Sequence, residues 1–153
     1  MRVIVGVDGS PQSAHALSWA CRRGETCGDT IRAVCAWSLG ASGEDWMSQP
    51  GVSAEGQRRA EQMLREAVER VRSDHPAVNV ETAVIEGPPA QVLVDMSANA
   101  DLLVVGSRGR GGFSELLLGS VSQQCVHHAR CPVTVVRQTN REVGAGSLRV
   151  VGR

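Results

Sequence analysis

The segment after Val105 has the residue types of a phosphate-binding loop. Four glycines, Gly106, Gly109, Gly111 and Gly112, fall within a short stretch there. Glycine adopts backbone conformations that other residues avoid, so such a stretch can approach a ligand closely. Successive backbone N–H groups in such a loop can then surround an anion. This segment is the first candidate for chemistry.

A helix is expected to begin directly after this loop. Gly119 would be costly inside a helix, whereas Ser120 followed three residues later by Gln123 has the form of a capping box. The helix N-terminus would then face the glycine-rich loop. The exposed amides of Val121 and Ser122, the hydroxyls of the two serines and the helix dipole would together form an anion site suited to phosphates.

Arg108 and Arg110 can add positive charge at the rim of this site. The plainer alternative is a glycine-rich turn that binds no ligand. The dinucleotide fingerprint GxGxxG is absent, because Ser114 stands where its third glycine would fall after Gly109 and Gly111. The pattern therefore disfavours a nicotinamide-dependent dehydrogenase.

Composition excludes several other functions. The 153 residues carry 16 basic and 16 acidic side chains, which is typical of one globular domain and gives no basic surface for nucleic acid. All basic residues are arginine, so the lysines of a Walker A loop, a kinase strand or a Schiff base are absent. With 3 Trp, 1 Phe and no Tyr, a base-stacking platform is also disfavoured.

The elements that must position the loop alternate between strand and helix. Short apolar runs predict strands over residues 2–8, 31–37, 78–85, 102–105 and 132–136. Helical spacing predicts helices from 11 to about 24, over 55–72 and over 90–98, besides the one starting at Ser120. This alternation predicts an α/β fold, a parallel sheet with helices on both faces.

Local signals refine this outline. Ser10 can cap the first helix with Pro11 in its first turn, and Gly24 and Gly28 mark its exit. The helix over 55–72 has one apolar stripe, formed by Ala60, Met63, Leu64, Ala67, Val68 and Val71. Residues 38–53 are expected to form a long loop.

Ligands of open parallel sheets lie outside the carboxyl ends of the strands. The loops after Asp8, Trp37 and Val105 are therefore the places to search. Asp8 has two interpretations: its carboxylate contacts a ligand, or it simply organises the turn with Gly9 and Ser10.

At this point the sequence resembles the universal stress protein family, whose ATP-binding branch carries a G-x2-G-x9-G-[ST] motif after the fourth strand. The motif matches Gly106, Gly109, Gly119 and Ser120. The resemblance spans about residues 1–137, from VGVDGSPQSAHALSWA to CPVTVVR. It implies one Rossmann-like domain whose open five-stranded sheet has the order 3-2-1-4-5, and a homodimer formed through the last strand, Pro132 to Val136.

The resemblance also implies one ATP per subunit, with Mg²⁺ as the usual companion. Adenine and ribose would lie beside Gly6, Val7, Asp8 and Ala36. Ribose and phosphates would be held by Gly106, Arg108, Gly109, Gly119, Ser120, Val121 and Ser122. In the loop over 38–53, Trp46 either covers this site or anchors its own loop.

Two other groups of residues could in principle carry chemistry. Cys125, His127, His128 and Cys131 suggest a metal site, but Cys125 and His128 are expected on the apolar face of their helix, with His127 pointing elsewhere and Cys131 beyond its end. Hydrolase chemistry has no support, because no GxSxG elbow is present.

We therefore expect a cytoplasmic, homodimeric, ATP-binding stress-response regulator that changes its binding to an unidentified protein partner, without contact to nucleic acid or membrane. No leader or 18-residue apolar run is seen, and five cysteines suit a reducing compartment. The alternatives are slow ATP hydrolysis or phosphotransfer assisted by Asp8, and a nucleotide-free dimeric scaffold. Preference among ATP, AMP and a cyclic nucleotide stays open. Residues 138–153 form a tail that could add an edge strand.

Overall fold

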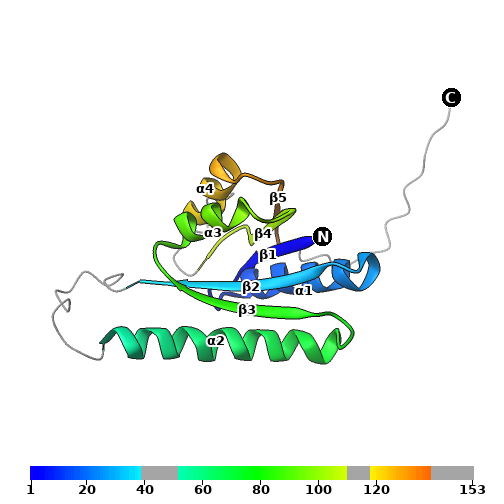
Figure 1. The fold of residues 1–153 in the computed structure, drawn as a ribbon, viewed down its shortest axis with the longest axis horizontal. Helices are drawn as coiled ribbons and strands as arrows, with labels where there is room; N and C mark the ends of the chain where they lie inside the picture. The colour runs from blue at the N-terminus through cyan, green and yellow to red at the C-terminus, as the bar shows by residue number, and fades with distance from the viewer. Residues whose placement is uncertain (39–51, 110–117, 139–153) are drawn as a thin grey trace.

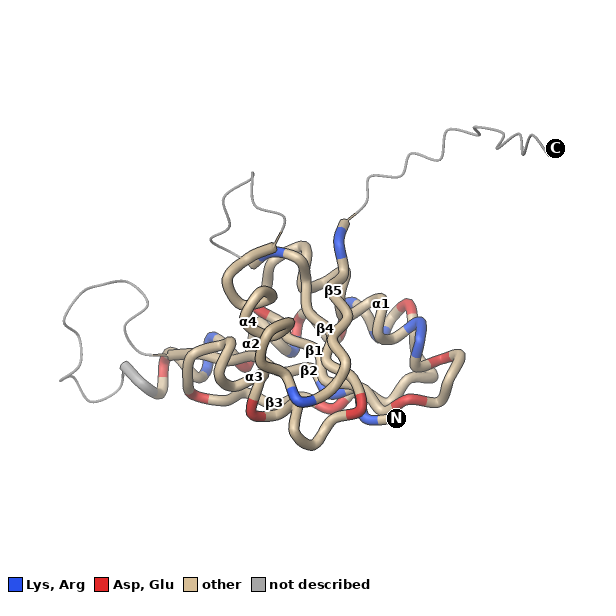
Figure 2. Tube along the Cα trace, turned by 90° about the horizontal axis from the view of Figure 1, so that it is seen from above, with Lys and Arg blue, Asp and Glu red and all other residues tan. Residues whose placement is uncertain are grey.

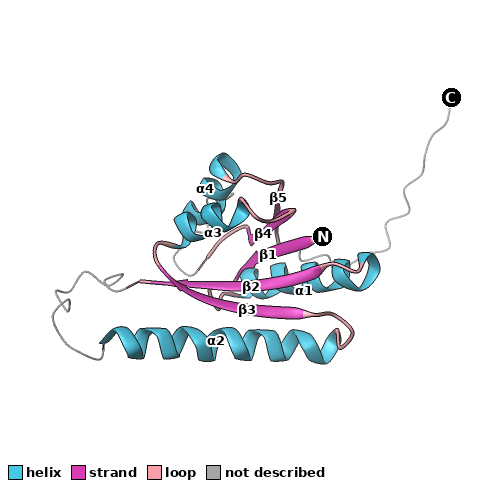
Figure 3. Ribbon diagram, in the orientation of Figure 1, coloured by secondary structure: helices cyan, strands magenta, loops and turns pink. Residues whose placement is uncertain are grey.

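The structure, a computed structural model, describes residues 1–38, 52–109 and 118–138. Five strands and four helices alternate along the chain (Figures 1 and 3). They are β1 (Arg2–Gly6), α1 (Pro11–Cys27), β2 (Thr30–Trp37), α2 (Val52–Asp74), β3 (Val80–Glu86), α3 (Pro89–Ser97), β4 (Leu102–Gly106), α4 (Ser120–His128) and β5 (Val133–Val136).

All strand pairs are parallel, and the sheet has the order β3-β2-β1-β4-β5. This confirms the predicted α/β fold and its strand order. The order reverses between β1 and β4, whose direct pairing brings Val5 opposite Val104. The loops that leave these two strands diverge to opposite sides of the sheet, which creates room for a ligand at their carboxyl ends.

Helices cover both faces of the sheet. Figure 1 shows α1 and α2 on one side and α3 and α4 on the other. The first core joins α1 and α2 to the sheet through fully buried residues such as Leu17 and Leu64. The second core, smaller, joins α3 and α4 to the sheet around Leu93, Leu103 and Cys125. The predicted stripe of α2 is confirmed, because all its members are buried or packed against the first core.

The first helix is longer than predicted. Its start agrees with the sequence, because Ser10 is the N-cap and its side chain accepts a hydrogen bond from the backbone of Ser13. At the other end, Gly24 stays helical and buried, and the helix ends at Cys27, followed by the C-cap Gly28 with a left-handed φ of 70°. Gly24 is retained for packing, since an added Cβ would lie 3.1 Å from Val78.

Other boundaries moved too: the helix predicted over 55–72 runs from Val52 to Asp74. The third strand begins at Val80 rather than at residue 78, because Val78 forms a turn in which its N–H donates to the carbonyl of His75. The last strand begins at Val133, and Pro132 lies just before it while accepting from the backbone of Leu103. The predicted tail and the loop over 38–53 lie mostly outside the described residues.

Among the described residues, no helix is both long and apolar enough to span a membrane. Basic and acidic residues are mixed along the surface helices rather than segregated by sign (Figure 2).

Candidate functional site

A cavity of about 460 Å³ lies at the carboxyl ends of β1, β2 and β4, between α3 and α4. The structure brings all the predicted site residues together around this one cavity. They are Gly6, Val7, Asp8, Ala36, Gly106, Arg108, Gly109, Gly119, Ser120, Val121 and Ser122. Residues that are more than 100 positions apart in the chain therefore share one concave surface, with a volume in the range of small-molecule sites.

Asp8 organises the turn, as one interpretation predicted, and it also lines the cavity, which leaves its contact with a ligand a prediction. Its Oδ1 accepts hydrogen bonds from the backbone N–H and the hydroxyl of Ser10, at 2.9 Å and 2.5 Å. Its Oδ2 lies on the side of Gly109, where an added Cβ would come within 2.6 Å of it. One carboxylate oxygen is thus used by the turn, and the other supplies an acceptor at the cavity.

The N-terminus of α4 supplies the donors. The helix begins at Ser120, as predicted, but its N-cap is Gly119, and no side chain caps it. The predicted capping box is therefore wrong: Ser120 is the first helical residue rather than the cap. The amides of Ser120, Val121 and Ser122 have no partner within the helix, because the first turn of a helix has no preceding carbonyls. Its first turn also has no acidic residue.

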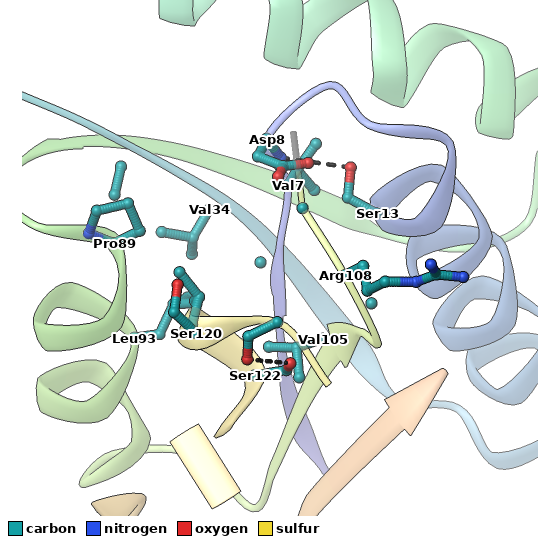
Figure 4. A pocket seen from close by; sticks show the side chains of 16 residues that line it. Val7, Asp8, Ser13, Val34, Pro89, Leu93, Val105, Arg108, Ser120 and Ser122 are labelled. Atoms are coloured by element: carbon teal, nitrogen blue, oxygen red, sulfur yellow. Dashed lines mark hydrogen bonds between the residues drawn. The ribbon is translucent and has the colours of Figure 1, made fainter. Parts of the chain in front are cut away.

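The hydroxyl of Ser122 points to the protein rather than to a ligand. Ser122 is buried, and its Oγ donates to the carbonyl of Gly119 at 2.9 Å and of Ser107 at 3.1 Å. The sequence led us to expect this hydroxyl as a phosphate donor, and the structure differs because its single proton is already shared between two carbonyls. Ser120 is exposed, and its side chain lines the cavity (Figure 4).

Two glycines of the motif allow close packing. A Cβ on Gly106 would lie 2.8 Å from the backbone carbon of Gln12, at the start of α1. A Cβ on Gly119 would lie 3.3 Å from the Cα of Arg108. The absence of side chains here lets α1, β4 and α4 meet at the cavity.

Arg108 is half-buried and lines the cavity. Figure 4 shows its guanidinium directed away from Ser120 and Ser122. In the described part of the lining, the formal charges are this one cation and the carboxylate of Asp8. At the α4 end of the cavity, the hydrogen-bond donors are therefore the backbone amides of the first turn and the Ser120 hydroxyl, and not the guanidinium of Arg108.

Five lining residues were not predicted from the sequence: Ser13, Val34, Pro89, Leu93 and Val105. Pro89 and Leu93 form a wall that belongs to α3. The sequence could have indicated this wall, because the segment after β3 leaves the carboxyl edge of the sheet, as do the loops after the other strands. This wall approaches β1 because Gly6 has no side chain, and an added Cβ there would lie 2.9 Å from Leu93.

The cysteine and histidine cluster forms no metal site in the described residues, where no group of three or more His, Cys, Asp or Glu could hold an ion. Cys125 is fully buried, and burial raises its pKa to about 11. His128 was expected on the apolar face and is exposed, because α4 ends at this residue. Arg110 and Trp46 lie outside the described residues.

Comparison with known proteins gives consistent matches. The model of the universal stress protein family matches residues 1–137. A universal stress protein of Mycobacterium tuberculosis is 41% identical over 138 residues, which cover 90% of this chain and 45% of the relative. A universal stress protein of Mycolicibacterium smegmatis is 34% identical over 139 residues, which cover 88% of this chain and 45% of the relative. The chain thus spans less than half the length of these curated relatives.

Solved structures show the same fold. Universal stress protein UspA from Lactobacillus plantarum superposes with a TM-score of 0.77 at 22% identity, covering 90% of this chain and 97% of that one. A universal stress protein solved in complex with cAMP has a TM-score of 0.68 at 26% identity, with coverages of 91% and 98%. A family member from Arabidopsis thaliana, solved with AMP bound, has a TM-score of 0.63 at 24% identity, with coverages of 92% and 93%.

Proposed function

The chain belongs to the universal stress protein family, and on that premise we propose that its cavity binds a nucleotide, with ATP as the ligand. Binding would regulate which surface the protein presents to a protein partner, by favouring one conformation over another. Relatives of known structure were solved with cAMP and with AMP, which supports nucleotide binding as the general property.

The observation that carries the proposal is the polarity of the cavity. One end offers the acceptor Oδ2 of Asp8, and the other end offers the amides of the first turn of α4. Apolar surfaces from Val34, Leu93 and Val105 also line the cavity. A nucleotide has the matching kinds of group: a base or sugar that donates hydrogen bonds, an apolar ring and an anionic phosphate. Helix N-termini favour such anions.

Magnesium would be bound mainly by the ligand. Asp8 is the one carboxylate in the described lining, and its Oδ1 is already used by Ser10. Mg²⁺ commonly keeps several waters and is held by one or two carboxylates together with phosphates. The residues present therefore fit an ion that arrives with a triphosphate and contacts Asp8 at most through one oxygen.

The homodimer through Pro132 to Val136 is also part of the proposal. In the described sheet, β5 is an edge strand that pairs with β4 alone, and an edge strand offers unpaired backbone groups to a second chain. The curated relatives are more than twice as long as their matched segment, which leaves room for a second domain in one chain. The cytoplasmic location stays a prediction.

Calorimetric titration of nucleotide-stripped protein tests the proposal. We expect saturable binding of about one ATP per chain in the presence of Mg²⁺, with AMP and cAMP titrated in parallel to rank the ligands. Absence of heat and of a thermal shift with all three would contradict nucleotide binding and favour the scaffold alternative.

A pair of glycine variants distinguishes an effect on nucleotide affinity from an effect on folding stability. Gly109→Ala places a Cβ 2.6 Å from Oδ2 of Asp8. Either the Asp8 side chain or the loop at Gly109 must then shift, and nucleotide binding should weaken by at least about tenfold. Gly28→Ala is the control: its φ of 70° strains an alanine, yet no atom lies within 4 Å of the added Cβ. It should cost about 1 kcal/mol of stability and leave the affinity unchanged.

A further inference from the structure

The two serines of the first turn of α4 have different surroundings although they are two positions apart. Ser120 is exposed at the cavity, and no hydrogen bond of its side chain is formed within the described part of the chain. Ser122 is 3% exposed, and its hydroxyl bonds to the carbonyls of Gly119 and Ser107. The serine side chain therefore faces the cavity at position 120 and is buried against backbone carbonyls at position 122.

The bonds of Ser122 close a ring at the junction between β4 and α4. The carbonyl of Ser107 accepts from the N–H of Gly119 at 2.7 Å as well as from Ser122. The N–H of Ser107 donates to the carbonyl of Val136 at 2.9 Å. The carbonyl of Gly119 accepts from Ser122 and from the N–H of Gln123. The buried hydroxyl thus connects the residue after β4 to the start of α4, and the backbone of Ser107 links this junction to the end of β5.

The ring ties the first turn of α4 to the end of β4. Gly119 as N-cap contributes no side chain to hold this turn, and no side-chain cap bond exists. Without Ser122, the remaining bond that holds Gly119 directly to the β4 end is its N–H to the carbonyl of Ser107. Both carbonyls would keep a backbone donor, but the turn would lose the side-chain bond that ties α4 to Ser107, so the junction would open more often.

We propose that Ser122 is a positioning residue, which holds the amides of α4 in the orientation that binds the anionic group. The hydroxyl of Ser122 presents only lone pairs to the cavity, because its proton is shared between two carbonyls. It cannot donate to a phosphate oxygen in this arrangement. This inference rests on the proposed nucleotide function for its ligand, but its structural part can be measured without a ligand.

The experiment compares Ser122→Ala with the matched variant Ser120→Ala, which makes the same chemical change in the same turn. The first readout is the exchange of the Gly119 amide in the nucleotide-free protein, measured by NMR. We expect about tenfold faster exchange of this amide in Ser122→Ala and no change in Ser120→Ala. The amide of Ile31, which donates to Asn79 across the sheet, should be unchanged in both.

The second readout is binding of AMP and of ATP with Mg²⁺. We expect Ser122→Ala to weaken both by a similar factor of about tenfold, because the shared amides are misplaced. At saturating nucleotide, exchange of the Gly119 amide in Ser122→Ala should return toward the wild-type rate, since the bound anion holds the turn. A residue that only stabilises the fold would not show this recovery.

Each outcome decides the question. Unchanged Gly119 exchange in Ser122→Ala, or equally faster exchange in Ser120→Ala, would overturn the assignment of Ser122. Faster exchange of Ile31 together with Gly119 would also overturn it, because the loss would then be global. If the wild-type protein binds neither nucleotide while Gly119 still exchanges faster in Ser122→Ala, the junction role stands and the proposed function fails.

Discussion

Helices α1 and α4 begin at the same edge of the sheet and both contribute to the cavity, but their N-termini are completed differently. At α1, Ser10 caps the helix, and the carboxylate of Asp8 accepts two hydrogen bonds from Ser10. At α4, the N-cap is Gly119, which has no side chain, and no acidic residue stands in the first turn. The first helix end is capped by a side chain of its own sequence, whereas the second has no side-chain cap.

This difference shows what makes a helix end a binding site. Both ends carry the partial positive charge of a helix dipole. At α1 a negative charge from the chain already faces it, so a further anion would gain little. At α4 the open amides line a cavity, and Ser122 holds them in place by bonds to carbonyls. Local sequence chemistry at the cap therefore separates a structural terminus from a candidate ligand terminus.

The strongest way to break the comparison is to give α4 the kind of cap that α1 has. Gly119→Asp would place a carboxylate at the N-cap, where it can accept from the open amides. We expect nucleotide affinity to fall more than about 100-fold, because this charge occupies the anion position and repels phosphate. Calorimetric titration measures the loss.

Gly119→Asn is the matched control for this variant. Its side chain also caps a helix and meets the same contact, 3.3 Å between the added Cβ and the Cα of Arg108. Because Asn carries no charge, the loss of affinity should be clearly smaller than with Asp. Equal losses would mean that steric contact rather than charge closes the site. Urea unfolding should show both variants within about 1 kcal/mol of the wild type, as caps offset the contact.

Unfolding at alkaline pH tests whether the buried thiols of the two helices stabilise the fold to a similar extent. Cys21 of α1 and Cys125 of α4 are fully buried. Burial, helped at Cys21 by the charge of Glu25, raises each pKa from 9.0 to about 11. In the unfolded chain these thiols lose protons near pH 9, whereas in the folded protein they keep them. Their stabilising contribution is thus complete below pH 9 and is lost as the pH rises toward 11.

The chain has no Lys and no Tyr, so cysteines dominate titration in this interval. Urea unfolding between pH 8.5 and 11 should show a loss on the order of 1 kcal/mol per buried thiol. Cys21→Ala and Cys125→Ala should each flatten this dependence by a similar amount. A flat dependence in the unmodified protein would show that the buried thiols ionise as readily as exposed ones.

The cap of α1 gives a smaller and purely structural effect. Ser10→Ala removes the acceptor for the N–H of Ser13 and the donor to Asp8. We expect a loss of about 1 kcal/mol in urea unfolding with little change in nucleotide affinity. Ser120→Ala should do the opposite, changing affinity and leaving stability within about 0.5 kcal/mol. If both variants changed the same quantity, the division between the two helix ends would be wrong.

Sequence reasoning predicted the sheet and the stripe of α2, because apolar residues at strand and helix periods directly report burial. It also predicted residues that line one cavity, since the spacing of Gly106, Gly109, Gly119 and Ser120 reflects a loop between a strand and a helix. Assignments of these residues as nucleotide contacts are still predictions.

What sequence reasoning missed depends on tertiary contacts. The wall of Pro89 and Leu93 lies beside β1 because Gly6 leaves space for it, and neither residue alone indicates this packing. The direction of the Ser122 hydroxyl is set by the carbonyl of Ser107, which is fifteen positions earlier in the chain. Likewise, Gly24 alone indicates the end of a helix, whereas in the structure it lies inside the helix and packs against Val78.

The smallest expected effect concerns how a nucleotide protects the two helices. Cys21 and Cys125 react with a thiol reagent only after their helices open, since both are fully buried at pH 8 and keep their protons. In variants that retain one of these two cysteines, saturating nucleotide should slow labelling of Cys125 a few-fold, by about 2- to 5-fold, more than labelling of Cys21. Under the proposed function the ligand contacts the open end of α4, so α4 cannot open without releasing it, whereas α1 is completed by its own cap. Equal slowing of both thiols would mean that the helices open together, and that the difference between their N-termini is not transmitted beyond the first turn.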